Sequence, residues 1–255
     1  MSDSIVLTLD NIIYSEKDLA LIDLTFIPQH IAIVMDGNRR WAKTRMRSIK
    51  AGYCQGAKQL DVVVRAATEL GVKALTLYSF STENWKRREE EVNILMDLMK
   101  LYLSTKRDDL LREGVCLHTI GDLSRFPDSL KQQFEEAVQA TQNGKRIDLI
   151  LALNYGGRDE MRRAFLKMFQ ATQKGELEWK KITEQTISSY LDTAQWSDPE
   201  LVIRSSGEWR VSNFLMWQTA YSEVVVLNTL WPDFSPQDLL QAIIEYQRRQ
   251  RRFGG

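Results

Sequence analysis

An unbroken apolar run at residues 31–35 is the feature that most constrains the fold. Its sequence, Ile-Ala-Ile-Val-Met, does not alternate with polar residues, which predicts a strand that is covered on both faces, as in a parallel sheet. The run stops at Asp36 and Gly37, and Arg39 and Arg40 follow. Ligands of open parallel sheets bind beyond the carboxyl ends of the strands. The sequence therefore places a carboxylate beside two cations at the edge where such a sheet holds its ligand.

Further apolar runs alternate with helical patterns along the chain. Strands are predicted at 74–80, 115–120, 148–154, 201–203 and 224–227. Helices are predicted at 56–70, 89–112, 129–141 and 159–174, and a terminal helix begins at Pro236 after an N-cap at Ser235. No repeat and no flexible linker interrupts this order. We therefore expect an α/β fold with a single domain, in which a central, mostly parallel six-stranded sheet is flanked by helices.

The predicted helix at 159–174 carries apolar residues at the spacing of one helical face. These residues are Met161, Ala164, Phe165, Met168 and Phe169. The pattern is typical of a helix with one apolar face.

Composition excludes some partners and locations. Lys and Arg number 34 and so do Asp and Glu, so the formal charge is zero and no net field attracts nucleic acid. The two cysteines, Cys54 and Cys116, stand in no metal-binding or redox spacing, which favours packing roles in a reducing compartment. His30 and His118 have no ligand partner at a useful spacing, so we expect packing or capping roles for them. Without a signal peptide or a span of ~20 apolar residues, a soluble cytoplasmic protein is expected.

Polar segments follow three of the predicted strands, at 81–87, 154–158 and 204–213, and a parallel sheet brings such segments to one edge. The charged and amide residues expected to share this cleft are Asp36, Asn84, Arg39, Arg40, Arg87, Arg204 and Arg210. Five arginines repel one another unless an anion is bound, and guanidinium groups bind phosphate oxygens in pairs. A lone carboxylate beside them suits a divalent ion that bridges to phosphate. The cleft is therefore suited to a diphosphate.

The chain has neither the phosphate loop of nucleotide triphosphatases nor the glycine pattern of dinucleotide enzymes, which argues against both classes. It does resemble the cis-prenyltransferases, and in particular the undecaprenyl diphosphate synthase branch of that family, from about Pro28 to Gly255. The matching blocks lie at 30–43, 75–87, 154–158, 201–223, 230–234 and 251–255.

The resemblance implies a homodimeric, Mg²⁺-dependent enzyme that repeatedly condenses isopentenyl diphosphate onto an allylic diphosphate, expected to be farnesyl diphosphate. Its product would be a long-chain polyprenyl diphosphate with cis double bonds, expected to be undecaprenyl diphosphate for the lipid carrier of cell-wall synthesis. The catalytic domain would span 26–255, after an N-terminal extension at 1–25 with no assigned role. A peripheral membrane contact at product release is expected, and nucleic acid is not expected as a partner.

The resemblance also implies roles for individual residues. Asp36 would be catalytic and would bind the metal together with Glu223, and Asn84 would be the proton acceptor. Arg251 is interpreted either as part of a solvated helix end or as a residue that reaches the partner subunit's pocket. The implied substrate-binding residues are Gly37, Asn38, Arg39, Arg40, Trp41, Ser81, Thr82, Glu83, Trp85, Arg87, Arg204, Arg210, Val211 and Ser212.

One loop departs from the family pattern. Where members usually have Arg-x-x-Gly-His, this chain has Ile49 and, four residues on, Tyr53. Ile49 cannot bind phosphate, and Tyr53 replaces an imidazole that is thought to assist the leaving group. We hypothesise that Arg47 or Lys50 compensates, because both lie near the gap. Unchanged kinetics after alanine replacement of both residues would rule this out.

The segment 92–103 is apolar all round its helix, so two of its faces need to be covered. One face is expected to pack in the core or at a dimer contact, and the other to line a tunnel for the growing hydrocarbon, with Ile147 towards the closed end. The residues considered are Val92, Ile94, Leu95, Met96, Leu98, Met99, Leu101, Tyr102 and Leu103.

Two alternatives to a catalytic prenyltransferase are kept. A non-catalytic partner subunit of a heteromeric cis-prenyltransferase is expected to lack the motif aspartate, whereas this chain retains Asp36 with Arg204 and Arg210. A phosphohydrolase would need a nucleophile or a pair of water-activating metal ions, for which the sequence offers no ligand set.

Overall fold

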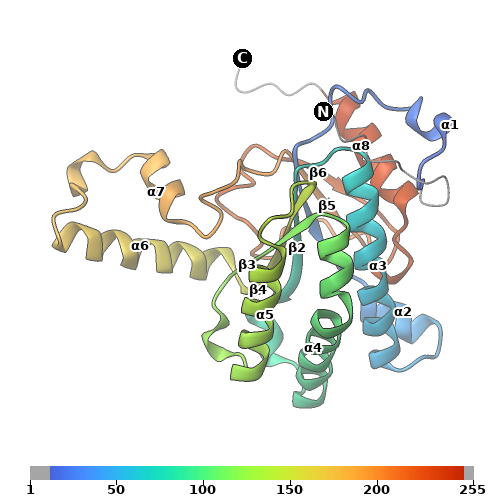
Figure 1. Ribbon diagram of the computed structural model, residues 1–255, viewed down its shortest axis with the longest axis horizontal. Helices are drawn as coiled ribbons and strands as arrows, with labels where there is room; N and C mark the ends of the chain where they lie inside the picture. Colours follow the sequence, from blue (N-terminus) through green and yellow to red (C-terminus); the bar gives the residue numbers. More distant parts are fainter. Residues whose placement is uncertain (1–11, 250–255) are drawn as a thin grey trace.

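The computed structural model describes residues 12–249, which form an α/β fold around one six-stranded sheet (Figure 1). The strands lie across the sheet in the order β3-β4-β2-β1-β5-β6, and each neighbouring pair is parallel. The predicted sheet is therefore confirmed, and in the described chain it is wholly parallel. The strands are β1 (His30–Val34), β2 (Ala74–Ser81), β3 (Val115–Ile120), β4 (Ile147–Tyr155), β5 (Leu201–Arg204) and β6 (Glu223–Val226).

The helices confirm most of the predicted pattern. α4 has the predicted bounds, whereas α3 begins earlier than predicted, because the Ser48 side chain caps it by accepting a hydrogen bond from the Ala51 amide at 3.2 Å. The sequence pattern missed α2 and α7, which have only seven residues each. The α-helices are α1 (Glu16–Leu19), α2 (Asn38–Thr44), α3 (Ile49–Glu69), α4 (Glu89–Arg112), α5 (Asp128–Thr141), α6 (Gly157–Gln173), α7 (Glu184–Tyr190) and α8 (Pro236–Arg248). The 3₁₀ helices are η2 (Thr82–Lys86), η3 (Leu123–Arg125), η4 (Trp179–Lys181) and η5 (Trp231–Asp233).

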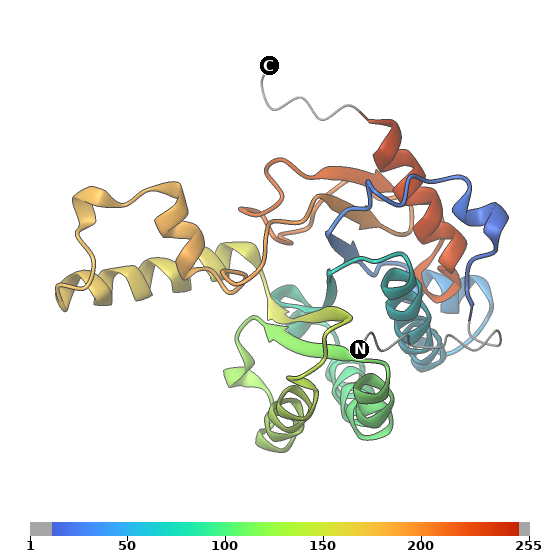
Figure 2. The ribbon, with the colours of Figure 1, turned by 45° about the horizontal axis from the view of Figure 1, so that its top comes forward.

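The two faces of the sheet are covered differently. Ile31 and Ile33 of β1 join the large buried cluster formed with the helices α3, α4, α5 and α8, while the alternate residues Ala32 and Val34 face a second cluster that includes Phe214. Figure 2 shows α3, α4 and α5 on one side of the sheet. Irregular segments before and after β5 cover the other side. β1 lies between β2 and β5, and all three strands run in the same direction. The loops that follow these strands therefore meet at one edge of the sheet.

Helix α6 is present as predicted, but only part of its apolar face is buried. Ala164 and Met168 are buried, but Phe165 and Phe169 have 57% and 60% of their surface exposed. The buried stripe of this helix runs through Glu160, Ala164 and Met168, so the two phenylalanines fall on a neighbouring, uncovered face. Figure 1 shows α6 and α7 projecting together from the body of the molecule.

Residues 12–25, which belong to the predicted N-terminal extension, pack onto the domain. Tyr14 is buried, and its hydroxyl donates a hydrogen bond to the Pro236 carbonyl at 3.0 Å. The Glu69 carboxylate at the end of α3 accepts hydrogen bonds from the backbone amides of Ile13 and Tyr14 at 3.0 Å. This segment therefore links α3 to the start of α8.

Among the helices that the structure describes, none is long and apolar enough to cross a bilayer.

Candidate active site

Asp36 lies directly beyond β1 in a turn that Ser205 holds in place. The Asp36 amide donates to the Val34 carbonyl at 3.0 Å and to the Ser205 hydroxyl at 2.9 Å, while that hydroxyl donates to the Asp36 carbonyl at 2.8 Å. Gly37 follows with a φ of 109°, and a Cβ atom there would come within 2.9 Å of the Leu230 side chain. Glycine is therefore required for the turn that leads into α2.

Arg204, the last residue of β5, pairs with Asp36 across the gap between the two strands. Its Nη2 atom lies 2.9 Å from Asp36 Oδ2, and only 5% of its side chain is exposed. Its Nη1 atom donates to Ser212 Oγ at 2.8 Å and to the backbone carbonyl of Arg210. Arg40 of α2 lies 3.6 Å from the same carboxylate oxygen. The guanidinium of Arg204 thus joins the loops that follow β1 and β5.

The surroundings of Asp36 favour its charged form. Burial alone would raise the pKa of this carboxyl group, but the hydrogen bond and charge of Arg204, with contributions from Ser206 and Arg40, lower the pKa below its usual value. Asp36 is therefore an anion at neutral pH although its side chain is largely covered. An ionised oxygen ligand at the edge of a cleft suits a hard divalent cation.

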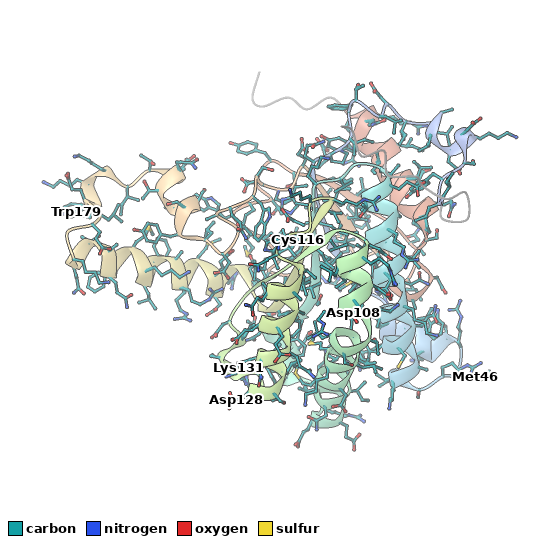
Figure 3. The ribbon with its side chains drawn as sticks, in the orientation of Figure 1. Met46, Asp108, Cys116, Asp128, Lys131 and Trp179 are labelled. Carbon is teal, nitrogen blue, oxygen red and sulfur yellow. The ribbon has the colours of Figure 1, made fainter. Side chains whose placement is uncertain are left out.

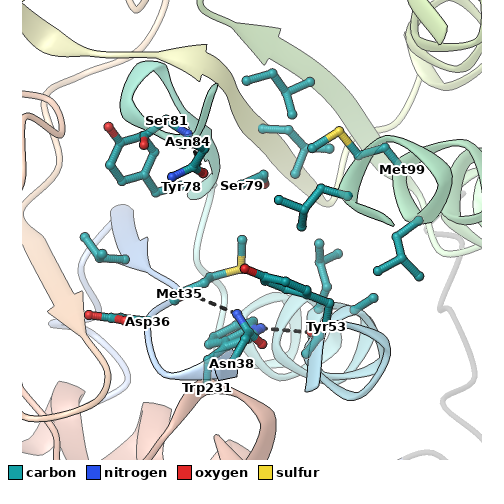
Figure 4. Close-up of a pocket in the computed structure, with 18 of the residues that line it drawn as sticks. Met35, Asp36, Asn38, Tyr53, Tyr78, Ser79, Ser81, Asn84, Met99 and Trp231 are labelled. Carbon is teal, nitrogen blue, oxygen red and sulfur yellow. Dashed lines mark hydrogen bonds between the residues drawn. The ribbon is translucent and has the colours of Figure 1, made fainter. Parts of the chain in front are cut away.

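A cavity of about 350 Å³ opens beside this pair (Figure 4). Figure 4 shows Ser81 and Asn84 together on one side of it, and Asn38 with Trp231 on the other. The polar residues follow β1, β2 and β5, as expected for a parallel sheet. The predicted site residues on its wall are Asp36, Asn38, Ser81, Asn84, Arg87, Arg204, Arg210 and Ser212.

The rest of the cavity wall is mainly apolar, and α4 supplies the largest share of any one helix. Leu98 and Met99 are examples of the segment that was considered for a tunnel, whereas Leu101 of the same helix is 56% exposed and Ile147 is buried in the core away from the cavity. One cavity therefore joins a charged end to a hydrocarbon-lined end, which suits an amphiphilic ligand. The apolar lining residues from α3, α4, α5 and β4 include Leu60, Leu95, Leu98, Met99, Tyr102, Leu103, Phe134, Leu151 and Leu153.

Several predicted site residues stand around the cavity without lining it. The Trp41 indole donates a hydrogen bond to Asp233 at 2.8 Å, and the Trp85 indole donates one to Asn154 at 2.8 Å. Both tryptophans therefore hold the surrounding loops in place. The predicted residues outside the lining are Gly37, Arg39, Arg40, Trp41, Thr82, Glu83, Trp85, Val211 and Glu223.

Other members of that group lie at the rim. Glu83 accepts a hydrogen bond from Asn213 at 3.1 Å, which ties the loop after β2 to the loop after β5. Val211 and Arg210 line a second, smaller cavity of about 220 Å³ next to the first. Arg39 is exposed on α2.

The sequence patterns missed contacts that helix packing creates. The Trp231 indole donates to the Gly56 carbonyl at 2.9 Å, and a Cβ atom on Gly56 would lie 2.2 Å from Asn38 Oδ1. Gly56 therefore lets α3 approach the loop that carries Asn38. Tyr78 and Ser79 of β2 also line the cavity, and only their place near the end of a predicted strand hinted at this.

The chain is similar to known proteins over most of its length. Residues 34–254 match the family described as "Putative undecaprenyl diphosphate synthase". The chain is 46% identical to an isoprenyl transferase of Clostridium tetani over 94% of both proteins, and 48% identical to one of Clostridium perfringens over 90% of both. The chain belongs to the undecaprenyl diphosphate synthase family. It is thus a prenyltransferase, and the predicted resemblance is confirmed.

Solved structures of other prenyltransferases share the fold. A lavandulyl diphosphate synthase from Lavandula x intermedia, in complex with dimethylallyl diphosphate, has a TM-score of 0.88 at 34% identity and covers 90% of this chain and 99% of its own. A probable undecaprenyl diphosphate synthase from Campylobacter jejuni has a TM-score of 0.75 at 31% identity, with coverage of 89% and 99%.

Within a single chain of this prenyltransferase, Glu223 lies far from the cavity. It pairs with Leu201 at the amino end of β5, whereas Asp36 follows Val34, the partner of Arg204 at the carboxyl end. Leu201 and Arg204, at the two ends of β5, are three residues apart, which corresponds to ~10 Å along the strand. Glu223 forms an ion pair with Arg249 at 3.0 Å. A metal ion shared by both carboxylates would therefore need Glu223 from another copy of the chain.

Tyr53 lines the cavity where the family usually has histidine. Its hydroxyl donates to Glu91 Oε1 at 2.5 Å and accepts a hydrogen bond from Arg87, which lies 2.9 Å from the same Glu91 oxygen. Burial and the bond to Glu91 raise the pKa of Tyr53, so its hydroxyl stays protonated and fixes Arg87 at the cavity. Arg47 and Lys50 are exposed and outside the cavity lining, and their compensating role stays a prediction.

Replacement of Arg204 by Met is expected to raise the pKa of Asp36, because burial of the carboxyl group then acts without the opposing hydrogen bond and charge. NMR titration of ¹³C-labelled aspartate carboxyl groups measures this pKa, which in the unchanged protein should lie below the ordinary value of ~3.9. Arg45→Met is the control, since Arg45 pairs with Asp233 at 2.9 Å instead. The same Asp36 pKa in the unchanged protein and in Arg204→Met would contradict the pairing.

Proposed function

We propose that this protein is a cis-prenyltransferase that condenses isopentenyl diphosphate sequentially onto an allylic diphosphate. Farnesyl diphosphate is the proposed starter, and a long-chain polyprenyl diphosphate, undecaprenyl diphosphate for the cell-wall lipid carrier, is the proposed product. The observation that carries the proposal is the single cavity that joins Asp36 and Arg204 to the apolar side chains of α4. The relative that was solved with dimethylallyl diphosphate supports an allylic diphosphate as one substrate.

A buried polar atom at the site supports a bound diphosphate. Arg204 Nε is buried and has no hydrogen-bond partner among the described residues. A buried polar atom without a partner costs ~1–3 kcal/mol, which a ligand that reaches it offsets. This nitrogen is a donor and needs an acceptor, which a diphosphate in the cavity beside Arg204 would supply.

Mg²⁺ is the proposed metal, and Asp36 is the residue of this chain that would hold it. Mg²⁺ is usually bound by one or two protein carboxylates together with substrate phosphates and water, which fits one ionised Asp36 beside a diphosphate. When bound, the ion would neutralise the charge that develops on the leaving diphosphate.

The remaining chemistry is positioning and proton transfer. Breakage of the allylic carbon–oxygen bond leaves a carbocation and a diphosphate, and Arg39 and Arg40 are proposed to stabilise that diphosphate. Arg204 and Arg210 hold the diphosphate of isopentenyl diphosphate, which orients its double bond towards the cation. Asn84 is the proposed acceptor of the proton that is then lost, and its Oδ1 atom accepts a hydrogen bond from the Ser81 amide at 3.1 Å.

A homodimer is the proposed assembly. Phe165, Phe169 and Trp179 on the projecting part of the chain have 57%, 60% and 65% of their surface exposed. Exposed apolar residues that cluster on one element are typical of a protein interface. Arg251 lies outside the described residues, and its reach into the partner subunit's pocket stays a prediction. Sedimentation that finds only monomer at micromolar concentration would contradict the dimer.

The cytoplasm is the proposed location, with a peripheral membrane contact when the product leaves. Both cysteines are free, in keeping with a reducing compartment. The product has a diphosphate head and a long hydrocarbon tail, so a bilayer is the natural acceptor for it.

Replacement of Asp36 by Ala is expected to lower kcat/KM about a hundredfold or more, because one electrostatic contact in a transition state contributes ~3 kcal/mol. The assay uses radiolabelled isopentenyl diphosphate, farnesyl diphosphate and Mg²⁺, with chromatography of the products. Asp108→Ala is the matched control, since the Asp108 side chain is 83% exposed on α4. No elongation by the unchanged protein would favour a non-catalytic subunit, release of free phosphate would favour a phosphohydrolase, and full activity of Asp36→Ala would overturn the mechanism.

Replacement of Leu98 by Trp is expected to shorten the product, because Leu98 lines the apolar end of the cavity and a larger ring fills space that the growing chain needs. Product length is read by the same chromatography. Leu101→Trp provides the control on the same helix, because Leu101 is 56% exposed and outside the lining. Unchanged product length in Leu98→Trp, or equal shortening in both variants, would contradict the tunnel assignment.

A further inference from the structure

A second group of metal-type ligands lies on the sheet, away from the catalytic cavity. Cys116 and His118 are two residues apart on β3 and therefore point to the same face. Asp148 of β4 is the direct partner of Cys116 in the parallel register. Figure 3 marks Cys116 on β3, which is an edge strand of the sheet. None of the three residues lines the cavity, which meets β4 only at Leu151 and Leu153.

The three side chains converge. The Cys116 sulfur, one imidazole nitrogen of His118 and one carboxylate oxygen of Asp148 all lie within 4.8 Å of one another. His118 Nε2 is 3.0 Å from Asp148 Oδ1, while the Trp196 indole donates a hydrogen bond to Asp148 Oδ2 at 3.0 Å. The Trp196 ring packs edge-on against His118 with 4.9 Å between ring centroids.

We propose that Cys116, His118 and Asp148 form a binding site for a divalent transition-metal ion of the Zn²⁺ class, with water as the fourth ligand. A thiolate, an imidazole and a carboxylate are the ligand types that Zn²⁺ prefers, and three protein ligands leave one position of a tetrahedron open. The side chains of His118 and Asp148 are 22% and 37% exposed, which gives the ion and the water a way in.

The same ligand set separates this site from the proposed Mg²⁺ site. Mg²⁺ prefers an octahedron of oxygen ligands, so a sulfur and a nitrogen within the group disfavour it. A thiolate and a carboxylate together balance the two positive charges of Zn²⁺. Trp196 holds the second oxygen of Asp148, as outer hydrogen bonds commonly orient the ligands of a metal ion.

Binding must displace one proton. The thiolate is the form of cysteine that binds a metal ion, so the Cys116 thiol must lose its proton. The ion forms a bond to sulfur as the thiol proton leaves to solvent. The Nε2 proton of His118, which the Asp148 carboxylate accepts in the free site, moves to Nδ1 by exchange with solvent, so that the Nε2 lone pair binds the metal. No electron is transferred in this step.

The sequence pattern missed this group because its third member comes from another strand. Cys116-x-His118 alone is a weak signal, and His118 and Asp148 are 30 residues apart. The proposal gives a metal-binding role to His118, for which the sequence predicted packing or capping.

Titration of the full-length, reduced and metal-free protein with Co²⁺ tests the proposal, because a thiolate bound to Co²⁺ produces a sulfur-to-metal charge-transfer band in the near ultraviolet. The chain has only two cysteines, so Cys54→Ser is the matched control. We expect the band with one equivalent of Co²⁺ in the unchanged protein and in Cys54→Ser, its loss in Cys116→Ser, and its displacement by one equivalent of Zn²⁺. Excess Mg²⁺ should leave it unchanged.

Further variants separate ligation from a general effect on folding. His118→Ala and Asp148→Asn should each weaken Co²⁺ binding, and Trp196→Phe should weaken it about tenfold through the loss of the outer hydrogen bond. Absence of the band in the unchanged protein with excess Co²⁺, or its persistence in Cys116→Ser, would overturn the proposal. The readout is spectroscopic and needs no prenyltransferase activity, so its failure is distinct from failure of the proposed function.

Discussion

The ion pair between Arg204 and Asp36 is the interaction on which the rest of the site depends. A guanidinium group that is almost fully buried is costly unless a charged partner and further hydrogen bonds surround it. Parallel pairing supplies that partner, because Val34 and Arg204 are in register and Asp36 lies just beyond them. Ser212 and the Arg210 carbonyl occupy the other guanidinium nitrogen, Nη1, so the loop after β5 folds around the same group. The position of this pair thus fixes the charged end of the cavity.

The strands were predictable from sequence because a parallel sheet buries them on both sides. Such burial selects continuous apolar runs, as at 31–35, and these runs coincide with the observed strands. Short helices do not produce a comparable pattern in the sequence. α2 buries only Ala42, so seven mostly polar residues carry no helical period, and their conformation depends on the turn at Gly37 and on packing against α3. Phe165 and Phe169 share the apolar spacing of α6 but are exposed, so the spacing predicted the helix without showing which of its residues are buried.

Site residues that lie at or just after the carboxyl end of a strand could be predicted from the sequence. Residues that reach the site only through the packing of helices and strands could not. Asp36, Asn84 and Arg204 come together because parallel strands finish at one edge. Glu223 was assigned to the site through its matching block, although the strand predicted at 224–227 already implied that this residue lies at the amino end of a strand, at the opposite edge of the sheet. Strand register likewise brings Asp148 beside Cys116, a distance in sequence that no local spacing rule covers.

Helix α3 borders both the cavity and the loop that carries Asn38. It contributes Tyr53 and Leu60 to the cavity wall, and its Gly56 leaves so little space that the side chain of Asn38 rests directly against the helix backbone. The apolar part of the cavity wall and the loop that carries Asn38 therefore rest on the same helix. A displacement of this one helix would alter both the room for an apolar ligand and the support of the charged loop, so the two ends of the cavity are not structurally independent.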